Sequence, residues 1–461
     1  MRAAFLLISI LVASAAGWCA RGPAITRSAI HRQGGAWVED LRCDFPLRSG
    51  RWLALHADRG SVDVTPGPSD HVRCRVHLAA YLENRERARN CLNGYELKVV
   101  PTDSGVDLTG RFVCSAPPQN LIARFDLEPP LRINLELSTR QGGLSIERLQ
   151  GQLRAQTAAG DITAGNIMGP VFVSTGGGAI HLGDIGAAAR IESGGGGIQV
   201  GNVNGEAGLE TRGGDITAGV VNGPVEARTG AGSIALQAAS GPVVAISEGG
   251  QIRLGECGNS VRVRTAGGNV QVAGAHGRIA VETAGGNISL LQAMSSVLAE
   301  TARGRILARI DASSRTFGPS RLVTGGGDVD LLLPPGLPVT ISALMAQPAR
   351  PVASDFPLSI RHAGGLFSPL RAEGSVAGGG ANLSIRVDKG GLQIRRVNPA
   401  EAAQLSVFQQ RFWRDWREAE SQRSLALRQL DALRQQLQQQ NAAIQEQLRQ
   451  LNRQFEEKNG E

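Results

Sequence analysis

Apolar and polar residues alternate with a period of two through the middle of the chain. Ile216 and Ala218 share one side, as do Val225 and Ala227, and glycines separate such short runs. A period of two is that of β-strands, and no helix of useful length fits between the glycines. The pattern therefore predicts many short strands joined by glycine-containing turns.

The strands recur every 18 residues. Ten successive positions at this spacing carry a hydroxyl group, and they are Thr139, Thr157, Thr175, Ser193, Thr211, Thr229, Ser247, Thr265, Thr283 and Thr301. A glycine stands three residues after each, from Gly142 to Gly304, and an aliphatic residue stands five residues after each. This recurrence predicts an all-β fold, a β-solenoid in which each 18-residue coil stacks on the next. Ten coils at the usual strand spacing would form a rod on the order of 45–50 Å long.

One coil is not stable by itself. It buries about five aliphatic side chains at roughly 2 kcal/mol each, whereas ordering its backbone and side chains costs roughly 1.5 kcal/mol per residue. Stacking must supply the missing contacts and hydrogen bonds. We expect the recurring glycine to need a positive φ or a close approach of two backbones. The hydroxyls either bond one another along the stack or cap the adjoining turn.

The glycine-rich turns do not have the features of a phosphate-binding loop. Such a loop needs Gly-Lys-Ser/Thr at the start of a helix, and these turns have no lysine and no helix after them. Cys257 is in register with Val203 and Val221, an inward position, so we interpret it as a small buried hydrophobic residue and not as a nucleophile.

Irregular segments flank the repeats. Residues 60–64 read as an early coil in an N-terminal β region over 24–138, where residues 82–93 are the one helical candidate. The solenoid extends over 139–397. After Thr301 the motif returns at Thr324, about five residues late, and strand patterns continue at 331–333, 381–385 and 391–394. We expect these ends to form β caps, because a bare end coil would expose the edge of a sheet.

Residues 399–461 differ in kind from the repeats. Gln, Leu and Arg dominate, and Leu430, Leu437, Ile444 and Leu451 lie seven residues apart. This spacing predicts an amphipathic helix, which either associates with copies of itself as a coiled coil, docks on the solenoid, or serves as a solvated spacer.

The first 17 residues have the pattern of a signal peptide. Arg2 precedes an apolar run over residues 3–13, and small residues follow at 14–17. That run is too short to span a bilayer, and no later run of 18 apolar residues exists. The prediction is export to the periplasm, cell surface or medium. Trp18 argues against lipidation of Cys19, because lipoprotein signals place a small residue there.

Export makes disulfides possible for the cysteines before the repeats. These candidates are Cys43, Cys74, Cys91 and Cys114, and they lack the close spacing of a zinc site. Four cysteines allow three connectivities. Among them we favour Cys43–Cys114 with Cys74–Cys91.

Composition adds two constraints. Aromatic residues make up 4% of the chain and glycine contributes 60 residues, which suits a thin repetitive β-structure. The net charge of +7 comes almost entirely from arginine, without a basic stripe between aromatics. We therefore expect no nucleic-acid partner.

Several of these features together resemble a known family. The ladder T-x-G-G-x-I-x-V, the entry at Val62-Asp63-Val64, the exit at 331–334 and the closing segments 379–385 and 391–394 are similar to those of the bacterial putative-adhesin β-strand-repeat family. That family is a domain of unknown function. The resemblance covers roughly residues 50–397 and implies a β-solenoid in an exported protein associated with the cell surface. It supplies no catalytic residue and no cofactor.

The leading hypothesis is a non-enzymatic surface or periplasmic scaffold that binds an unknown polymer or protein, with residues 399–461 as a candidate oligomerisation segment. One alternative is a carbohydrate-active β-helix enzyme, for which Asp161 and Asp215 would supply carboxylates. A role for both in corner turns is the simpler interpretation. A hexapeptide acyltransferase is disfavoured because the aliphatic spacing is not six. His181 and His276 are isolated, and we expect no metal site.

Overall fold

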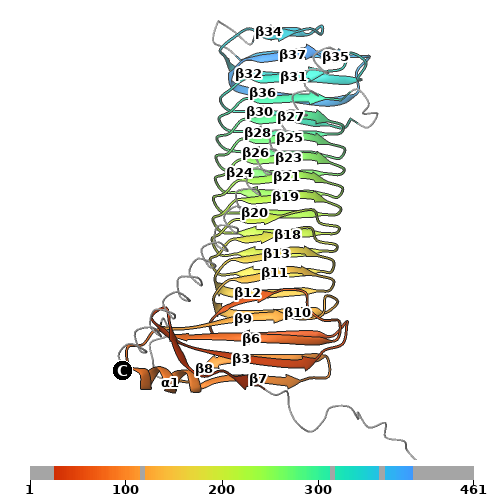
Figure 1. The fold of residues 1–461 in the computed structure, drawn as a ribbon. Helices are drawn as coiled ribbons and strands as arrows, with labels where there is room; N and C mark the ends of the chain where they lie inside the picture. The colour runs from red at the N-terminus through yellow and green to blue at the C-terminus, as the bar shows by residue number, and fades with distance from the viewer. Residues whose placement is uncertain (1–24, 115–119, 312–316, 363–368, 398–461) are drawn as a thin grey trace, which may run out of the picture.

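The computed structural model describes residues 25–114, 120–311, 317–362 and 369–397. These residues form a straight rod of stacked coils with an irregular cap at each end (Figure 1). The signal peptide, Cys19 and the helix predicted within 399–461 are expectations from the sequence that lie outside the described residues. Within the described part, no helix has the length and apolar character needed to cross a bilayer.

Each coil of the rod contributes one strand to each of two parallel sheets, called sheet A and sheet B. Sheet A holds β11 (Leu144–Leu149), β13 (Ile162–Ile167), β15 (Ile180–Leu182), β17 (Ile198–Val200), β19 (Ile216–Val221), β21 (Ile234–Ala239), β23 (Ile252–Cys257), β25 (Val270–Ala275), β27 (Ile288–Ala293), β29 (Ile306–Ile310) and β31 (Val329–Leu333). Sheet B holds β10 (Asn134–Gln141), β12 (Leu153–Ala159), β14 (Val171–Thr175), β16 (Ala189–Ser193), β18 (Ala207–Thr211), β20 (Val225–Thr229), β22 (Val243–Ser247), β24 (Val261–Thr265), β26 (Ile279–Thr283), β28 (Val297–Thr301) and β30 (Ser320–Thr324).

The register between coils follows the 18-residue period. Ile216 pairs with Ile198 on one side and with Ile234 on the other, and Ile234 pairs with Ile252. All of these side chains are at most 2% exposed. The predicted inward column is confirmed, and a single hydrophobic core extends from Leu41 in the N-terminal cap to Ile394 near the other end. The late return of the motif is confirmed too, because Thr301 pairs with Thr324.

The hydroxyl column caps the adjoining turn. Every hydroxyl of the column donates to the carbonyl oxygen of the recurring glycine in the preceding coil, at 2.8–3.3 Å. From Thr211 to Thr283 each hydroxyl also accepts the N–H of the glycine in its own coil. These side chains are 2–6% exposed. Of the two roles foreseen for the hydroxyls, the structure has the turn cap, and it explains why serine replaces threonine.

The recurring glycine is required by the close approach of successive turns. At Gly250 an added Cβ would lie 1.9 Å from the carbonyl oxygen of Gly232, and at Gly178 it would lie 2.0 Å from that of Gly160. Gly142 and Gly160 also have a positive φ of 132° and 145°. Both expected reasons for glycine, a positive φ and a close approach of two backbones, therefore hold, and the close approach recurs along the column.

The N-terminal cap extends both sheets. Its elements are β1 (Thr26–Arg27), β2 (His31–Gln33), β3 (Ala36–Pro46), β4 (Trp52–Ala57), β5 (Ser61–Val64), β6 (His71–Ala80), α1 (Arg85–Asn93), β7 (Tyr95–Pro101), β8 (Gly105–Phe112) and β9 (Leu121–Glu128). Strands β4 and β5 form the predicted early coil, because they pair in parallel with β10 and β11. The predicted helix is α1, whose N-terminus is capped by the Asn84 side chain accepting the Arg87 N–H at 3.0 Å.

The favoured disulfide pairing is wrong. Helix α1 carries Cys91 to the segment that follows β8, where Cys91 is bonded to Cys114 across a Cα–Cα distance of 5.2 Å. Cys43 on β3 and Cys74 on β6 are instead direct cross-strand partners, both buried and both free thiols. Sequence spacing carried no information on the register of β3 and β6, and that register decides which cysteines meet.

The C-terminal cap has an analogous arrangement. It comprises β32 (Val339–Pro348), β33 (Ala353–Ser354), β34 (Ser359–His362), β35 (Leu370–Val376), β36 (Ala381–Gly390) and β37 (Leu392–Arg396). Strand β36 lies between β30 and β32 and is parallel to both, and β37 pairs with β31. The segment β32–β35 is therefore inserted between two adjacent coils, as β6–β9 is at the other end. Short outer strands such as β33 and β34 leave little sheet edge exposed.

We predict that Gly250→Ala lowers the free energy of unfolding by about 3 kcal/mol or more, because the new methyl group overlaps the Gly232 carbonyl. Gly249→Ala is the matched control, since its Cβ would meet nothing closer than 3.9 Å. Urea unfolding monitored by circular dichroism measures both. Equal losses in the two variants would contradict the role assigned to the close approach.

We predict that Thr229→Val destabilises the protein by about 1–3 kcal/mol, because the Gly214 carbonyl and the Gly232 N–H lose their partner inside the protein. Thr229→Ser keeps both hydrogen bonds and should lose clearly less. The same unfolding experiment compares the two, and a valine variant as stable as the serine variant would show that the hydroxyl is dispensable.

Candidate functional site

The outer face of sheet B carries a groove over strands β10 to β20. Two adjoining hollows make it, with volumes of about 410 and 320 Å³, and they share Phe172, Arg190 and Glu192. We call this feature the sheet-B groove. It exists because outward side chains in successive coils differ, whereas the inward ones repeat.

A missing side chain opens the larger hollow. Gly208 occupies an outward position of β18, directly between Arg190 on β16 and Glu226 on β20. Its neighbours in this column carry long side chains, so glycine leaves a gap. A Cβ at this position would meet nothing closer than the Ala189 carbonyl oxygen at 3.9 Å. The gap is therefore not demanded by backbone packing, unlike the recurring turn glycines.

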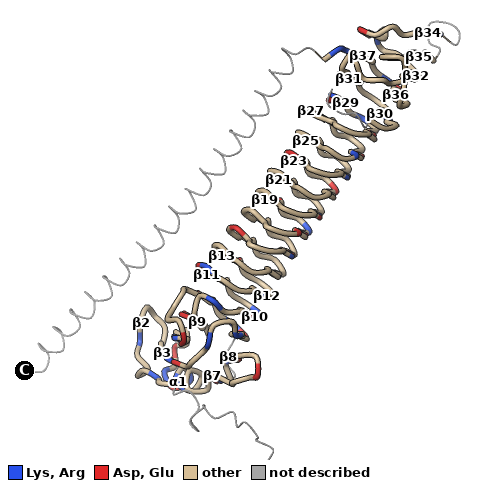
Figure 2. Tube along the Cα trace, turned by 90° about the vertical axis from the view of Figure 1, so that its right-hand side faces the viewer, with Lys and Arg blue, Asp and Glu red and all other residues tan. Residues whose placement is uncertain are grey.

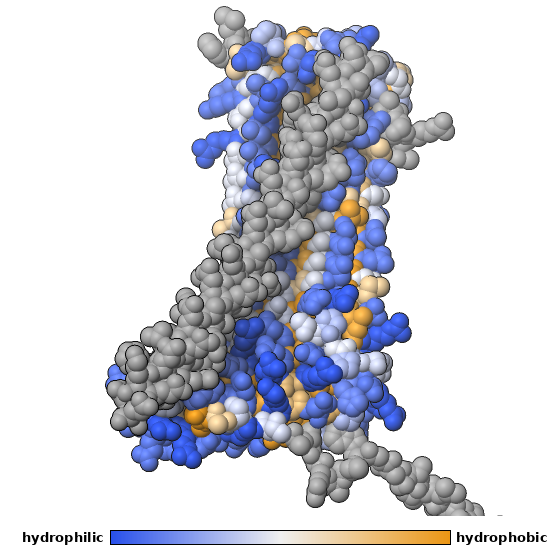
Figure 3. All heavy atoms as spheres, viewed as in Figure 1, coloured by the Kyte–Doolittle hydropathy of each residue, from blue (hydrophilic) through white to orange (hydrophobic). Residues whose placement is uncertain are grey.

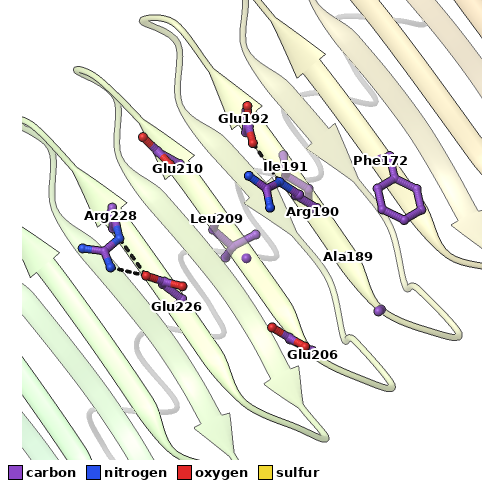
Figure 4. A pocket seen from close by; sticks show the side chains of 12 residues that line it. Phe172, Ala189, Arg190, Ile191, Glu192, Glu206, Leu209, Glu210, Glu226 and Arg228 are labelled. Carbon is purple, nitrogen blue, oxygen red and sulfur yellow. Dashed lines mark hydrogen bonds and ion pairs between the residues drawn. The ribbon is translucent and has the colours of Figure 1, made fainter.

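The groove is acidic and partly apolar. Phe172 is 45% exposed and stands beside Arg190 in Figure 4. Arg190 pairs with Glu192 at 2.9 Å, and Arg228 pairs with Glu226. Glu206 and Glu210 make no ion pair with any described residue. Four carboxylates therefore face two guanidinium groups in the larger hollow, although the chain as a whole is basic. An aromatic surface beside surplus carboxylates suits a ligand that offers hydrogen-bond donors or positive charge.

The rest of the described surface has no comparable combination of an exposed aromatic ring and surplus carboxylates in one hollow. Charges of both signs are scattered along the tube in Figure 2, and polar side chains cover most of the face seen in Figure 3, with narrow apolar strips between them. A third hollow of about 640 Å³ lies on the N-terminal cap. Its four arginines and four carboxylates balance, with ion pairs such as Arg124–Asp63 at 2.9 Å and Arg73–Glu128 at 3.4 Å, so it has no surplus charge. We therefore take the sheet-B groove as the candidate site.

The carboxylates singled out in the sequence occupy corners. Asp161 accepts the Ala179 N–H at 2.8 Å, and Asp215 accepts the Ser233 N–H at 2.7 Å, each from the following coil. They lie three coils apart, or about 14 Å at the usual strand spacing, beyond the roughly 5–9.5 Å of glycosidase carboxylate pairs. Their expected role in corner turns is confirmed. Cys257 is confirmed as a buried inward residue at 1% exposure, where burial raises the pKa of its thiol to about 12.

Sequence reasoning missed the groove. Glu192 and Glu210 are direct partners on adjacent parallel strands, whereas the carboxylates considered from the sequence lie in the corner column. The signal was present, because glutamates stand 18 residues apart at 192 and 210, and the glycine at 208 lies 18 residues from a long side chain on either side. Among the described residues, no three His, Cys, Asp or Glu side chains gather as they would around a metal ion.

Comparisons with known proteins find similarity among solved structures. No protein-family model matches the chain, and no curated protein matches it. The solved structure of a putative cell adhesion protein from Clostridium sporogenes is similar at 8% identity and a TM-score of 0.16, covering 82% of this chain and 100% of that one. A putative adhesin from Bacteroides fragilis is similar at 10% identity and a TM-score of 0.18, covering 78% and 97%. Similarity at this level carries no argument about ligand or activity.

One acidic side chain has a perturbed environment that yields a pH prediction. The Glu256 carboxylate occupies the space above Gly274, where an added Cβ would lie 2.1 Å from its Oε2 atom. Loss of water there raises the pKa of Glu256, and His276 partly offsets the effect.

A raised pKa means that the folded protein holds the Glu256 proton more tightly than the unfolded chain does. The contribution of Glu256 to stability is therefore complete below pH 4.5 and is lost as the pH rises through the raised pKa. We predict that the melting temperature of Glu256→Gln, measured relative to that of the wild type, is higher at pH 7 than at pH 4. Calorimetry at a series of pH values checks this, and a difference independent of pH would refute it.

Proposed function

We propose that the protein is a non-enzymatic, exported bacterial cell-envelope or surface protein, an adhesin-like scaffold that binds an extended polymer along the sheet-B groove. The single observation that supports the binding role most is the gap at Gly208. It lies on a surface where side chains are free to vary, in the same hollow as an exposed aromatic ring and two carboxylates without an ion pair to any described residue.

The shape of the groove favours an extended ligand. It runs across successive strands from Glu136 on β10 to Arg228 on β20, so a bound polymer would contact several coils in turn. A rod built from repeats presents such contacts on a rigid frame, which lowers the conformational cost of binding. We favour a glycan, whose hydroxyl or amino groups would donate hydrogen bonds to Glu206 and Glu210.

A polysaccharide-cleaving enzyme is the alternative that one observation favours. Glu192 and Glu210 are opposite each other on adjacent strands, which places their backbones about 4.8 Å apart. A retaining glycosidase holds its two carboxyl groups about 5–5.5 Å apart. Incubation of the purified protein with polysaccharides, followed by detection of new reducing ends, separates the two functions. If the wild type cleaves a polysaccharide and Glu210→Gln does not, the enzyme function replaces the scaffold proposal.

We predict that Gly208→Gln weakens glycan binding at least about tenfold, because its side chain fills the gap, and a lost central contact of this kind costs about 1–2 kcal/mol. Folding should be unimpaired, since the position has room for a side chain and a strand glycine is itself unfavourable by about 0.5–1 kcal/mol. A glycan array identifies a ligand for the wild type, and titration of that ligand measures each variant.

Phe172→Ala should weaken binding in the same way. Leu298→Ala is the matched control, because Leu298 occupies the same outward column seven coils away and lies outside the groove. If Gly208→Gln and Phe172→Ala both bind the ligand as tightly as the wild type, the ligand contacts a surface other than the sheet-B groove.

A further inference from the structure

The N-terminal cap holds two thiols that the structure brings together without joining them. Cys43 on β3 and Cys74 on β6 are directly opposite in an antiparallel pair, and each is 4% exposed. Opposite residues in such a pair have Cα atoms about 4.5–5.5 Å apart, within the roughly 4.4–6.8 Å that a disulfide spans. Both side chains belong to the same hydrophobic core.

We propose that Cys43 and Cys74 form a second disulfide in the exported protein, alongside Cys91–Cys114. This inference rests on the proposed export, because an oxidising compartment is needed for the bond to persist. A metal site does not account for the pair, since no third His, Cys, Asp or Glu joins them among the described residues. Cys257 provides the contrast, because its neighbours in the adjacent coils are Ala239 and Ala275.

The bond forms by exchange with an existing disulfide of a protein oxidant or a small molecule. The thiolate of one cysteine attacks that disulfide, its sulfur–sulfur bond breaks, and one thiolate leaves. The other cysteine then displaces the remaining thiolate from the mixed disulfide. Two protons leave Cys43 and Cys74, and the two electrons reduce the oxidant to two thiols.

The timing of this exchange follows from burial. The hydrogen bond from Cys43 and the loss of water raise the pKa of the Cys74 thiol, so the folded protein contains little thiolate to start the reaction. The exchange therefore takes place while the chain folds, before β3 and β6 close over the two sulfur atoms. Once formed, the bond is shielded from exchange by the same burial.

The bond would fasten the first coil to the cap. Strands β4 and β5 lie between Cys43 and Cys74 in the sequence, so the disulfide closes a loop around the coil on which β10 and β11 stack. Cys91–Cys114 closes a separate loop through α1, β7 and β8. Closing such loops restricts the unfolded chain and thereby stabilises the cap.

Peptide mapping tests the proposal directly. The full chain is purified from cells that export it, denatured without reductant in the presence of an alkylating reagent, and digested with trypsin. We expect peptide 43–48 linked to peptide 74–75, peptide 90–98 linked to peptide 112–124, and Cys257 alkylated.

The other outcomes overturn the proposal in distinguishable ways. Alkylated Cys43 and Cys74 beside an intact Cys91–Cys114 bond would sink the second disulfide and leave export standing. Alkylation of all four would contradict an oxidising location as well. Links from Cys43 to Cys114 and from Cys74 to Cys91 would show a different connectivity.

Stability supplies a second readout. Reductant should lower the melting temperature of the wild type by several degrees more than that of Cys43→Ala/Cys74→Ala. Cys257→Ala should keep the wild-type response to reductant, which controls for the loss of a buried sulfur. Equal responses in the wild type and the double variant would contradict a bond between Cys43 and Cys74.

Discussion

The structure depends on the contact between successive turns at the recurring glycine. There the backbone of one coil rests against the carbonyl of the coil before it, and a buried hydroxyl joins the two turns. This contact fixes the register, and a shift by one residue would turn every inward side chain outward. Gly250 and Ser247 show both parts of the contact within one turn. Because the register is fixed at the turn, the aliphatic columns align without further specification.

The same regularity leaves the outside free. Outward side chains touch only solvent and their neighbours in the next coil, so they can change without disturbing the core. The sheet-B groove arises from this freedom, since Gly208 stands between two long outward side chains while the inward residues beside it, Ala207 and Leu209, keep the repeat. Function in such a fold belongs to the irregular outward positions, and stability belongs to the periodic ones.

Periodicity determined how much of the fold could be predicted from the sequence. The coils, their register, the buried Cys257 and the corner role of Asp161 all follow from an 18-residue spacing, and the structure bears them out. The disulfide pairing and the groove did not follow from it. Which cysteines meet depends on the pairing of β3 with β6, and the groove depends on side chains that differ from coil to coil. A repeat spacing therefore predicts neither the disulfide pairing nor the groove.

At each end one segment of the cap, β6–β9 or β32–β35, is inserted in the sequence between two adjacent coils, and this bears on how proteins of this design can differ in size. These inserted segments pair with the coil β4–β5 at one end and with the coil β36–β37 at the other. Whole units between Thr157 and Thr283 could be duplicated or removed while every contact between cap and coil stays the same. Duplication or loss of coils alone would therefore change the distance between the two ends, in steps of one strand spacing.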